Sequence, residues 1–219
     1  MRIAMRRHPI ALIAAFGLLA GCSALSALSD AAEPRDAFQL QAPLPGPVAR
    51  GTPRAEDVIV EIPSASGAID TDRILVRPSA TQVQYLPDAT WIEPVPQMIQ
   101  SALVDGLERS GGFRFVGRKP LGSSGDVAVI SNIVTFDAAL EPGSKAATIE
   151  VRLALRLVRE EDVSVLASRT FAASDRAEDT STEALVAAYD RATSRVVGEA
   201  LDWVLRQRGV RLAASGNTP

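Results

Sequence analysis

The chain has 219 residues, with 23 Lys and Arg against 26 Asp and Glu, one cysteine and one histidine. This mildly acidic balance argues against a nucleic-acid partner, and a single cysteine leaves none for disulfides within the chain. The one histidine, His8, lies in an N-terminal segment that we expect to be removed. The mature chain would then lack Ser-His-Asp and Cys-His chemistry and the commonest zinc ligand.

The N-terminal segment has the features of a secretory signal. Three arginines precede an apolar run at residues 10–20, which is too short for a bilayer that needs about 20 residues. The letters LAGC at residues 19–22 resemble the bacterial lipobox, in which a signal peptidase cuts before the cysteine and the thiol carries a lipid such as palmitate. We predict a lipoprotein signal peptide at residues 1–21 and lipidation of Cys22. The alternative is an ordinary signal peptide with an incidental cysteine.

The lipid would be the attachment of the mature chain to a membrane. Removal of residues 1–21 takes away three arginines and no acid, which leaves 20 basic and 26 acidic side chains and a net charge of −6. No later stretch has 18 consecutive apolar residues, and lipid chains can anchor a protein durably. Ser23 rather than Asp follows the cysteine, a pattern that implies export to the outer membrane. We therefore expect an outer-membrane protein that faces the periplasm.

The first half of the mature chain predicts a tether, several strands and one helix. Residues 23–57 are rich in Ala, Pro, Ser and Gly, which favours a tether with one short strand. Pro94 and Pro96 suit the entry of a helix at 96–110, and Gly111 can form its left-handed C-cap. Strand patterns bounded by turn-forming residues lie at Phe38 to Gln41, Val58 to Ile62, Ile74 to Arg77, Gln82 to Leu86 and Phe113 to Val116.

The second half predicts a meander of three strands and a long helix. Val127 to Phe136 has apolar residues of both parities, which is typical of a central strand covered on two faces. Thr148 to Val158 alternates apolar and charged residues, which indicates a sheet with one face open to water. Val163 to Ala172 returns after an acidic turn. The helix at 181–208 is expected to open with a capping box at Thr180 to Glu183.

These patterns predict an α+β fold in which a mostly antiparallel sheet packs against two helices. The expected organisation is a lipidated flexible tether at residues 22–37, a single domain at 38–210 and a disordered tail at 211–219.

Catalytic motifs are matched only in part. Neither Lys119 nor Lys145 has a serine three residues before it, so a Ser-x-x-Lys pair is missing. The glycines at 112 and 117 lack the Gly-Lys-Ser/Thr ending of a phosphate loop. The acidic run at 160–162 falls in an expected hairpin turn, where a solvated turn is favoured over an acid–base pair. We predict no catalytic residue, no metal and no cofactor, with carboxylate-only chemistry as the remaining enzymatic alternative.

Several segments, in the same order, carry a family resemblance behind the lipobox. They are Tyr85-Leu86, Trp91 to Pro96, Gln100, Leu107 to Phe113, Val116-Gly117, Leu166 to Phe171, Ala187 to Tyr189 and Asp202 to Leu205. Together they resemble the ABC-type transport auxiliary lipoprotein family of the PqiC type, over about residues 38–208.

The resemblance implies a non-enzymatic periplasmic component of a lipid transport system. Its partners would be an ABC ATPase, a permease and a protein with an MCE (mammalian cell entry) domain, while the lipid anchor holds the outer membrane. The transported lipid, its direction and the oligomeric state, including a homo-oligomer, stay open. The alternative function is that of an assembly lipoprotein that plugs or chaperones an outer-membrane barrel.

Tyr85 and Trp91 are the candidate partner-binding residues. Trp91 stands between Thr90 and a proline-rich turn, where a strand passes into a helix. One hypothesis is that this position leaves the ring only partly covered, and rigid aromatic side chains at such edges are common interface anchors. The alternative is that Trp91 closes the core beneath Tyr85.

Overall fold

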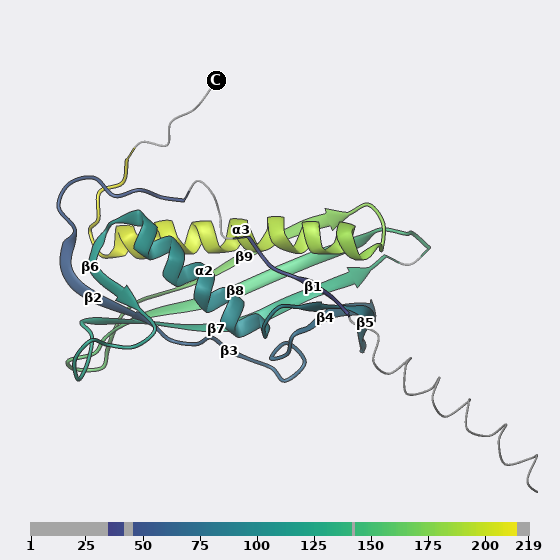
Figure 1. The fold of residues 1–219 in the computed structure, drawn as a ribbon, viewed down its shortest axis with the longest axis horizontal. Helices are drawn as coiled ribbons and strands as arrows, with labels where there is room; N and C mark the ends of the chain where they lie inside the picture. Colours follow the sequence, from purple (N-terminus) through teal and green to yellow (C-terminus); the bar gives the residue numbers. More distant parts are fainter. Residues whose placement is uncertain (1–34, 42–45, 142, 214–219) are drawn as a thin grey trace, which may run out of the picture. The chain divides into compact units, whose positions relative to one another are not determined.

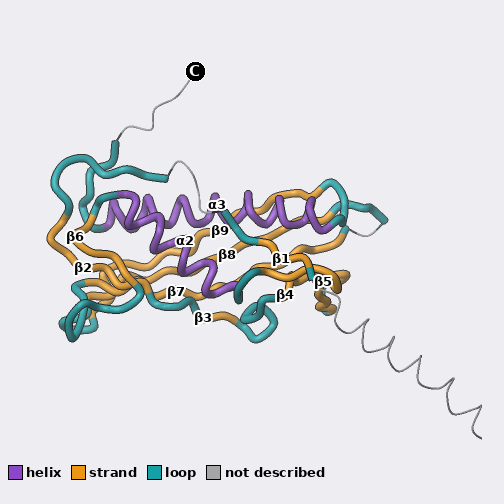
Figure 2. Tube along the Cα trace, in the orientation of Figure 1, coloured by secondary structure: helices purple, strands orange, loops and turns teal. Residues whose placement is uncertain are grey.

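The computed structural model describes residues 35–41, 46–141 and 143–213, so the expected lipidation site Cys22 lies outside the described residues. From Asp36 onward the chain forms one unit, with two helices on the same side of a nine-stranded sheet (Figure 1; Figure 2). The predicted α+β class is confirmed. The elements are β1 (Asp36–Phe38), β2 (Arg54–Val60), β3 (Ser64–Ala65), β4 (Arg73–Ser79), β5 (Gln82–Trp91), α2 (Val95–Ser110), β6 (Phe113–Gly117), β7 (Val127–Leu140), β8 (Ala147–Arg159), β9 (Ser164–Ala177) and α3 (Thr182–Gln207).

Strand β7 organises the sheet. One of its edges pairs antiparallel with β8 from end to end, and β9 continues this antiparallel ladder. Its other edge pairs in turn with β2, β3 and β4, all parallel to it. Beyond β2 lies β6, while β5 and β1 lie beyond β4. The long β7–β8–β9 ladder makes the sheet mostly antiparallel, as predicted.

The alternation in β8 sets which face of the sheet is buried. Its apolar side chains are buried on the side of the helices, whereas Arg152 and Arg156 are exposed on the opposite face. Neither helix covers that opposite face, which confirms the prediction of a sheet with one face open to water. The buried row consists of Ile149, Val151, Leu153, Leu155 and Leu157.

A β-bulge explains why apolar residues of both parities occur in β7. The pairing with β8 shifts between Ile133 and Thr135, so the inward parity changes from odd to even numbers at this point. Ile133 and Phe136 are therefore both buried under the helices, while Asn132 and Val134 are exposed. The expectation that β7 is covered on both faces is wrong in the middle of the strand.

Helix α2 ends where the sequence predicts and begins at Val95, one residue before the predicted start at residue 96. Pro94 occupies the N-cap, and Gly111 ends the helix in the left-handed conformation with φ of 64°. The buried amide of Gln100 donates a hydrogen bond to the carbonyl of Val60 at 2.8 Å and so joins α2 to β2. Gly106 faces Leu201 of α3 so closely that an added Cβ would lie 2.3 Å from its Cδ1. The two helices thus meet at a position that accepts only a glycine without rearrangement.

Helix α3 forms as expected, but its cap differs by one residue. Ser181 is the N-cap and its hydroxyl accepts from the amide of Ala184 at 3.4 Å. Glu183 therefore stands at the second helical position, and the reciprocal box predicted from Thr180 does not form. Within the described ranges, no helix combines the length and apolar character required to cross a bilayer.

The segments on either side of the domain pair with each other. Ala49 forms an isolated antiparallel bridge with Leu212, and the amide of Ala213 donates to the carbonyl of Val48 at 2.8 Å. Residues 46–53 thus belong to the domain rather than to a tether. The predicted limits of tether, domain and tail stay a prediction, because residues 22–34 and 214–219 lie outside the described residues.

The helix contact yields a first prediction. Gly106→Val should lower the free energy of unfolding by about 1–3 kcal/mol, since the added methyl groups overpack the contact with Leu201. Denaturant unfolding measures this change. The control is Gly122→Val, where nothing lies within 4 Å of an added Cβ. An equal effect of both substitutions would contradict the close helix contact.

Candidate functional site

Trp91, the first candidate contact, lies in the core. Its side chain is 1% exposed at the end of β5 and packs edge-on against Phe136 and Tyr189, at centroid distances of 6.1 and 5.5 Å. The expectation of a partly covered ring is wrong, and the alternative of a core residue holds. The reason is that β5 extends to Trp91, where it pairs with Phe38 of β1. Trp91 therefore supports the domain from inside.

Tyr85, the second candidate, is half-buried on β5. Its hydroxyl donates to the carbonyl of Ala68 at 3.2 Å, and the guanidinium of Arg73 lies 4.5 Å from the ring centroid. The ring face and the hydroxyl thus both have partners within the chain. A role of Tyr85 in partner binding stays a prediction. The predicted lipidation site Cys22 lies outside the described residues.

A cluster of charges joins helix α3 to the edge of β9. The carboxylate of Asp175 accepts from Arg191 at 2.8 Å and from Arg195 at 2.7 Å. Burial alone raises the pKa of Asp175, but the two arginine hydrogen bonds outweigh this effect and the pKa lies below its ordinary value of 3.8. Both arginines also donate to backbone carbonyls of β9, those of Arg176 and Ser174. This cluster is not among the sequence-based predictions, and its signal in the sequence is the four-residue spacing of the two arginines on one helix face.

A second ionic cluster joins the end of α3 to β2. The guanidinium of Arg208 and that of Arg54 each lie 2.8 Å from the carboxylate of Glu56. Burial raises the pKa of Glu56, and hydrogen bonds from Arg208 and then Arg54 outweigh it, so the pKa is lowered overall. The carboxylate is therefore ionised at neutral pH and serves as a structural acceptor.

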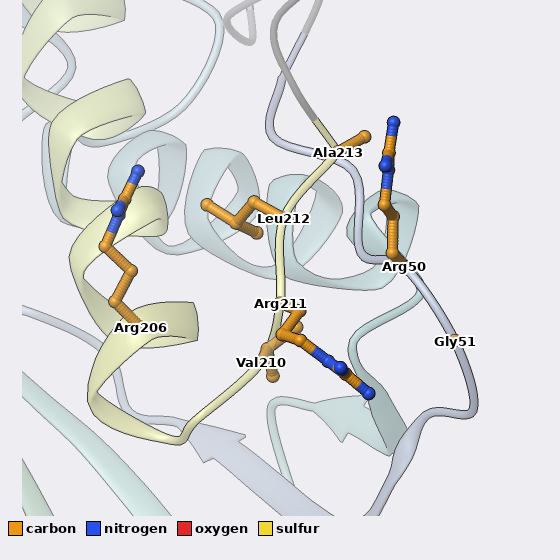
Figure 3. A pocket seen from close by; sticks show the side chains of 7 residues that line it. All are labelled: Arg50, Gly51, Arg206, Val210, Arg211, Leu212 and Ala213. Carbon is orange, nitrogen blue, oxygen red and sulfur yellow. The ribbon is translucent and has the colours of Figure 1, made fainter.

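A basic hollow of about 740 Å³ lies where residues 48–50 pair with 211–213 (Figure 3). Arg50, Arg206 and Arg211 line it. In Figure 3 the side chains of Arg50 and Arg206 point toward the top of the view, whereas that of Arg211 points toward the bottom. Arg206 is also ion-paired with Asp202 at 2.7 Å. The three guanidinium groups therefore do not converge on one anion.

Metal ligands do not gather in the described ranges, 35–41, 46–141 and 143–213. No group of three or more His, Cys, Asp or Glu there could hold a metal ion. The carboxylates of the two clusters instead accept hydrogen bonds from arginines, which fixes them in structural roles.

Fold and site together define a single α+β domain with both helices on one face of the sheet and a lipobox-like sequence in front. Residues 38–200 match the family of ABC-type transport auxiliary lipoprotein components. The chain belongs to this family, as its sequence resemblance predicts. A protein of this family is an auxiliary lipoprotein component of ABC-type transport.

The chain is also similar to two proteins of known structure and to one further sequence. The chain is 28% identical to protein XCC0632 of Xanthomonas campestris, whose crystal structure superposes with a TM-score of 0.64 over 74% of this chain and 95% of that one. Another crystal structure shares the fold at 16% identity and a TM-score of 0.58, covering 78% of this chain and 99% of that one. A Bradyrhizobium diazoefficiens protein, bll6063, is 27% identical over 65% of this chain. The match spans only 38% of that relative.

The burial of Trp91 yields a second prediction. Trp91→Ala should lower the free energy of unfolding by about 3–5 kcal/mol, because it removes a fully buried aromatic side chain. Its neighbour Ile92 is 51% exposed, and Ile92→Ala should change it by less than about 0.5 kcal/mol. Denaturant unfolding of both variants measures the difference. A folded Trp91→Ala variant of unchanged stability would contradict the core position.

The lowered pKa of Asp175 yields a third prediction. A carboxylate whose folded pKa is depressed stabilises the fold fully above its unfolded pKa, and this stabilisation is lost as pH falls through the folded pKa. Asp175→Asn should therefore lower the melting temperature at neutral pH and flatten its fall below pH 3.8. The control is Asp88→Asn, an exposed carboxylate on β5. An acid profile that Asp175→Asn leaves unchanged would show that the ion-pair cluster contributes no stability.

Proposed function

We propose that this protein is a non-catalytic auxiliary lipoprotein of an MCE-linked ABC system that transports lipids. The observation that carries the proposal is the family match, which begins at residue 38, shortly after the lipobox-like residues 19–22. The lipidated Cys22 would fix the protein to the outer membrane on its periplasmic side. The domain would then grip the MCE-domain protein while the permease and the ATPase drive transport.

The chemistry of the chain supports a binding role over catalysis. Residues 22–219 contain no histidine. The most engaged carboxylates, Asp175 and Glu56, are each held by two arginines, which keeps them ionised and unsuited to proton transfer near neutral pH. A domain of this kind contributes by holding partners in place.

The anchor is tested by Cys22→Ala. Cells grown with labelled palmitate should incorporate label into the wild-type chain and none into Cys22→Ala, since the thiol is the proposed attachment point. The matched variants Ser23→Ala and Ser23→Asp keep the thiol and should remain labelled. In membrane fractions, Ser23→Ala should stay with the outer membrane and Ser23→Asp should shift to the inner membrane. Labelled Cys22→Ala protein would refute the lipid anchor.

The transport role is tested by affinity purification of the tagged full-length chain from membranes. We expect the MCE-domain protein and the ABC permease to co-purify with it in mild detergent. The amount of recovered permease should fall when the gene for the MCE-domain protein is deleted. Deletion of the gene for this chain should also change the lipid composition of the outer membrane. Recovery of an outer-membrane barrel in their place would favour the assembly or plug function and contradict the proposal.

A further inference from the structure

Among the described strands, β9 pairs along one edge and leaves its other edge open. It pairs with β8 on one side, with a constant antiparallel register between residues 167 and 177. On the other side, the carbonyl of Ser174 accepts from Arg195 at 2.6 Å and that of Arg176 accepts from Arg191 at 3.3 Å. Even-numbered residues therefore direct their backbone groups away from β8. Since this direction alternates along an antiparallel strand, Ser168, Thr170 and Ala172 also face outward.

The arginines of α3 cover only the second half of this edge. Within the described part of the chain, no hydrogen bond reaches the backbone groups of Ser168, Thr170 and Ala172 from the outer side. The side chains of these three residues are small and exposed, so a second backbone can approach closely. An exposed edge of this kind is a template for pairing with another strand. Below, residues 168–172 are called the open edge.

Two opposite charges without ion pairs flank the open edge. Arg169 is exposed and lies 5.1 Å from the centroid of the Phe171 ring. Glu199 is an exposed residue of α3, one helical turn after Arg195 and one turn before Trp203. Because Arg195 contacts Ser174 and Trp203 packs on Phe171 at 5.7 Å, Glu199 stands above the edge between them. Neither Arg169 nor Glu199 forms a salt bridge with another described residue.

A two-fold axis through Thr170 brings these groups together between two copies of the chain. It pairs Thr170 with itself and Ser168 with Ala172, so all outward backbone groups of the open edge find partners. The same axis sets Arg169 of one copy opposite Phe171 of the other, beneath Glu199. An axis through residue 169 would instead set Ala172 opposite Leu166, where the register between β8 and β9 shifts.

We propose that the open edge pairs antiparallel with the same segment of a second copy, around a two-fold axis through Thr170, with Arg169 of each copy facing Glu199 of the other. This inference goes beyond the proposed transport role and does not depend on it. Arg191 and Arg195 occupy the carbonyls that follow the open edge, so the shared ladder ends there. A two-fold contact uses the edge of both copies and closes the assembly at a dimer.

The register is tested by cross-linking of single-cysteine substitutions in the full chain. In the proposed dimer, two Thr170→Cys side chains are adjacent, whereas two Ala172→Cys side chains lie about 14 Å apart, four residues at about 3.4 Å each. A short bis-maleimide should therefore give at least about tenfold more dimer from Thr170→Cys than from Ala172→Cys. Both variants keep Cys22, which serves as a common background. Equal yields would overturn the register.

The charge pairing is tested by exchange of the two charges. Sedimentation equilibrium of the full chain in detergent should show that Arg169→Glu and Glu199→Arg each raise the dissociation constant of the dimer by about threefold to tenfold. The double variant should restore the wild-type constant, because both pairs are then re-formed with reversed signs. A double variant no better than the single ones would overturn the pairing. All four side chains involved across the two copies are exposed, and circular dichroism of each variant checks its fold.

Two further outcomes decide the existence of the dimer. A wild-type chain that remains monomeric at every concentration measured overturns the proposal. Cross-linking of Thr170→Cys to a different protein in whole cells would identify an extended strand of a partner as the occupant, and would overturn the two-fold dimer as well.

Arg195→Ala should strengthen self-association, since it exposes the carbonyl of Ser174 and lengthens the edge.

Discussion

The contact of Tyr189 with three strands is the interaction on which the rest of the structure depends. Its hydroxyl donates to the carbonyl of Leu75 in β4 at 2.5 Å, and its ring stacks on Phe136 of β7 and meets Trp91 of β5 edge-on. Burial raises the pKa of Tyr189 well above its ordinary value, and the charge of Asp137 adds to this, so the hydroxyl remains a donor. One side chain of α3 thus fixes the helix to the sheet.

This contact matters because the β4–β5 part of the sheet has little backbone pairing with β7. Only Val76 and Arg77 of β4 are in register with β7. The Arg77–Asp137 ion pair, at 2.5 Å, adds a contact on the outer face. Side-chain packing beneath α3 therefore has to hold β4 and β5 against β7, because the short ladder contributes few hydrogen bonds. The aromatic side chains of Trp91, Phe136 and Tyr189 provide this packing.

The sequence predicts the elements well because their periodicity is local. The alternation of β8 and the glycine that ends α2 both follow from neighbouring residues, and both agree with the structure. Parallel pairing of β2, β3 and β4 with one edge of β7 depends on residues far apart in the chain, which no local pattern encodes. The bulge at Val134 is a similar case, because one inserted residue reverses which parity is buried.

The candidate site was predictable to a smaller extent. The lipobox and the family resemblance depend on short ordered motifs, and the family placement followed from them. The burial of Trp91 depends on how far β5 continues. The sequence before the proline-rich turn does not show which residue is the last of the strand. The arginines at 191 and 195 could be seen as a pair on one helix face. Their hydrogen bonds to carbonyls of β9 could not be predicted, because the sequence does not show which strand lies beneath α3.

A lipid anchor at Cys22 and an open strand edge would reinforce each other physically. An edge that offers backbone groups at only Ser168, Thr170 and Ala172 forms a short ladder, and a short ladder binds weakly between molecules free in solution. Attachment at Cys22 would confine the copies to one membrane surface and raise their effective concentration, as linked binding modules do for each other. Arg191 and Arg195 limit the ladder at the same time, so crowding on that surface does not extend the contact along the whole of β9. Confinement thus favours a closed pair over open-ended association, because the covered half of the strand leaves only one short segment for pairing.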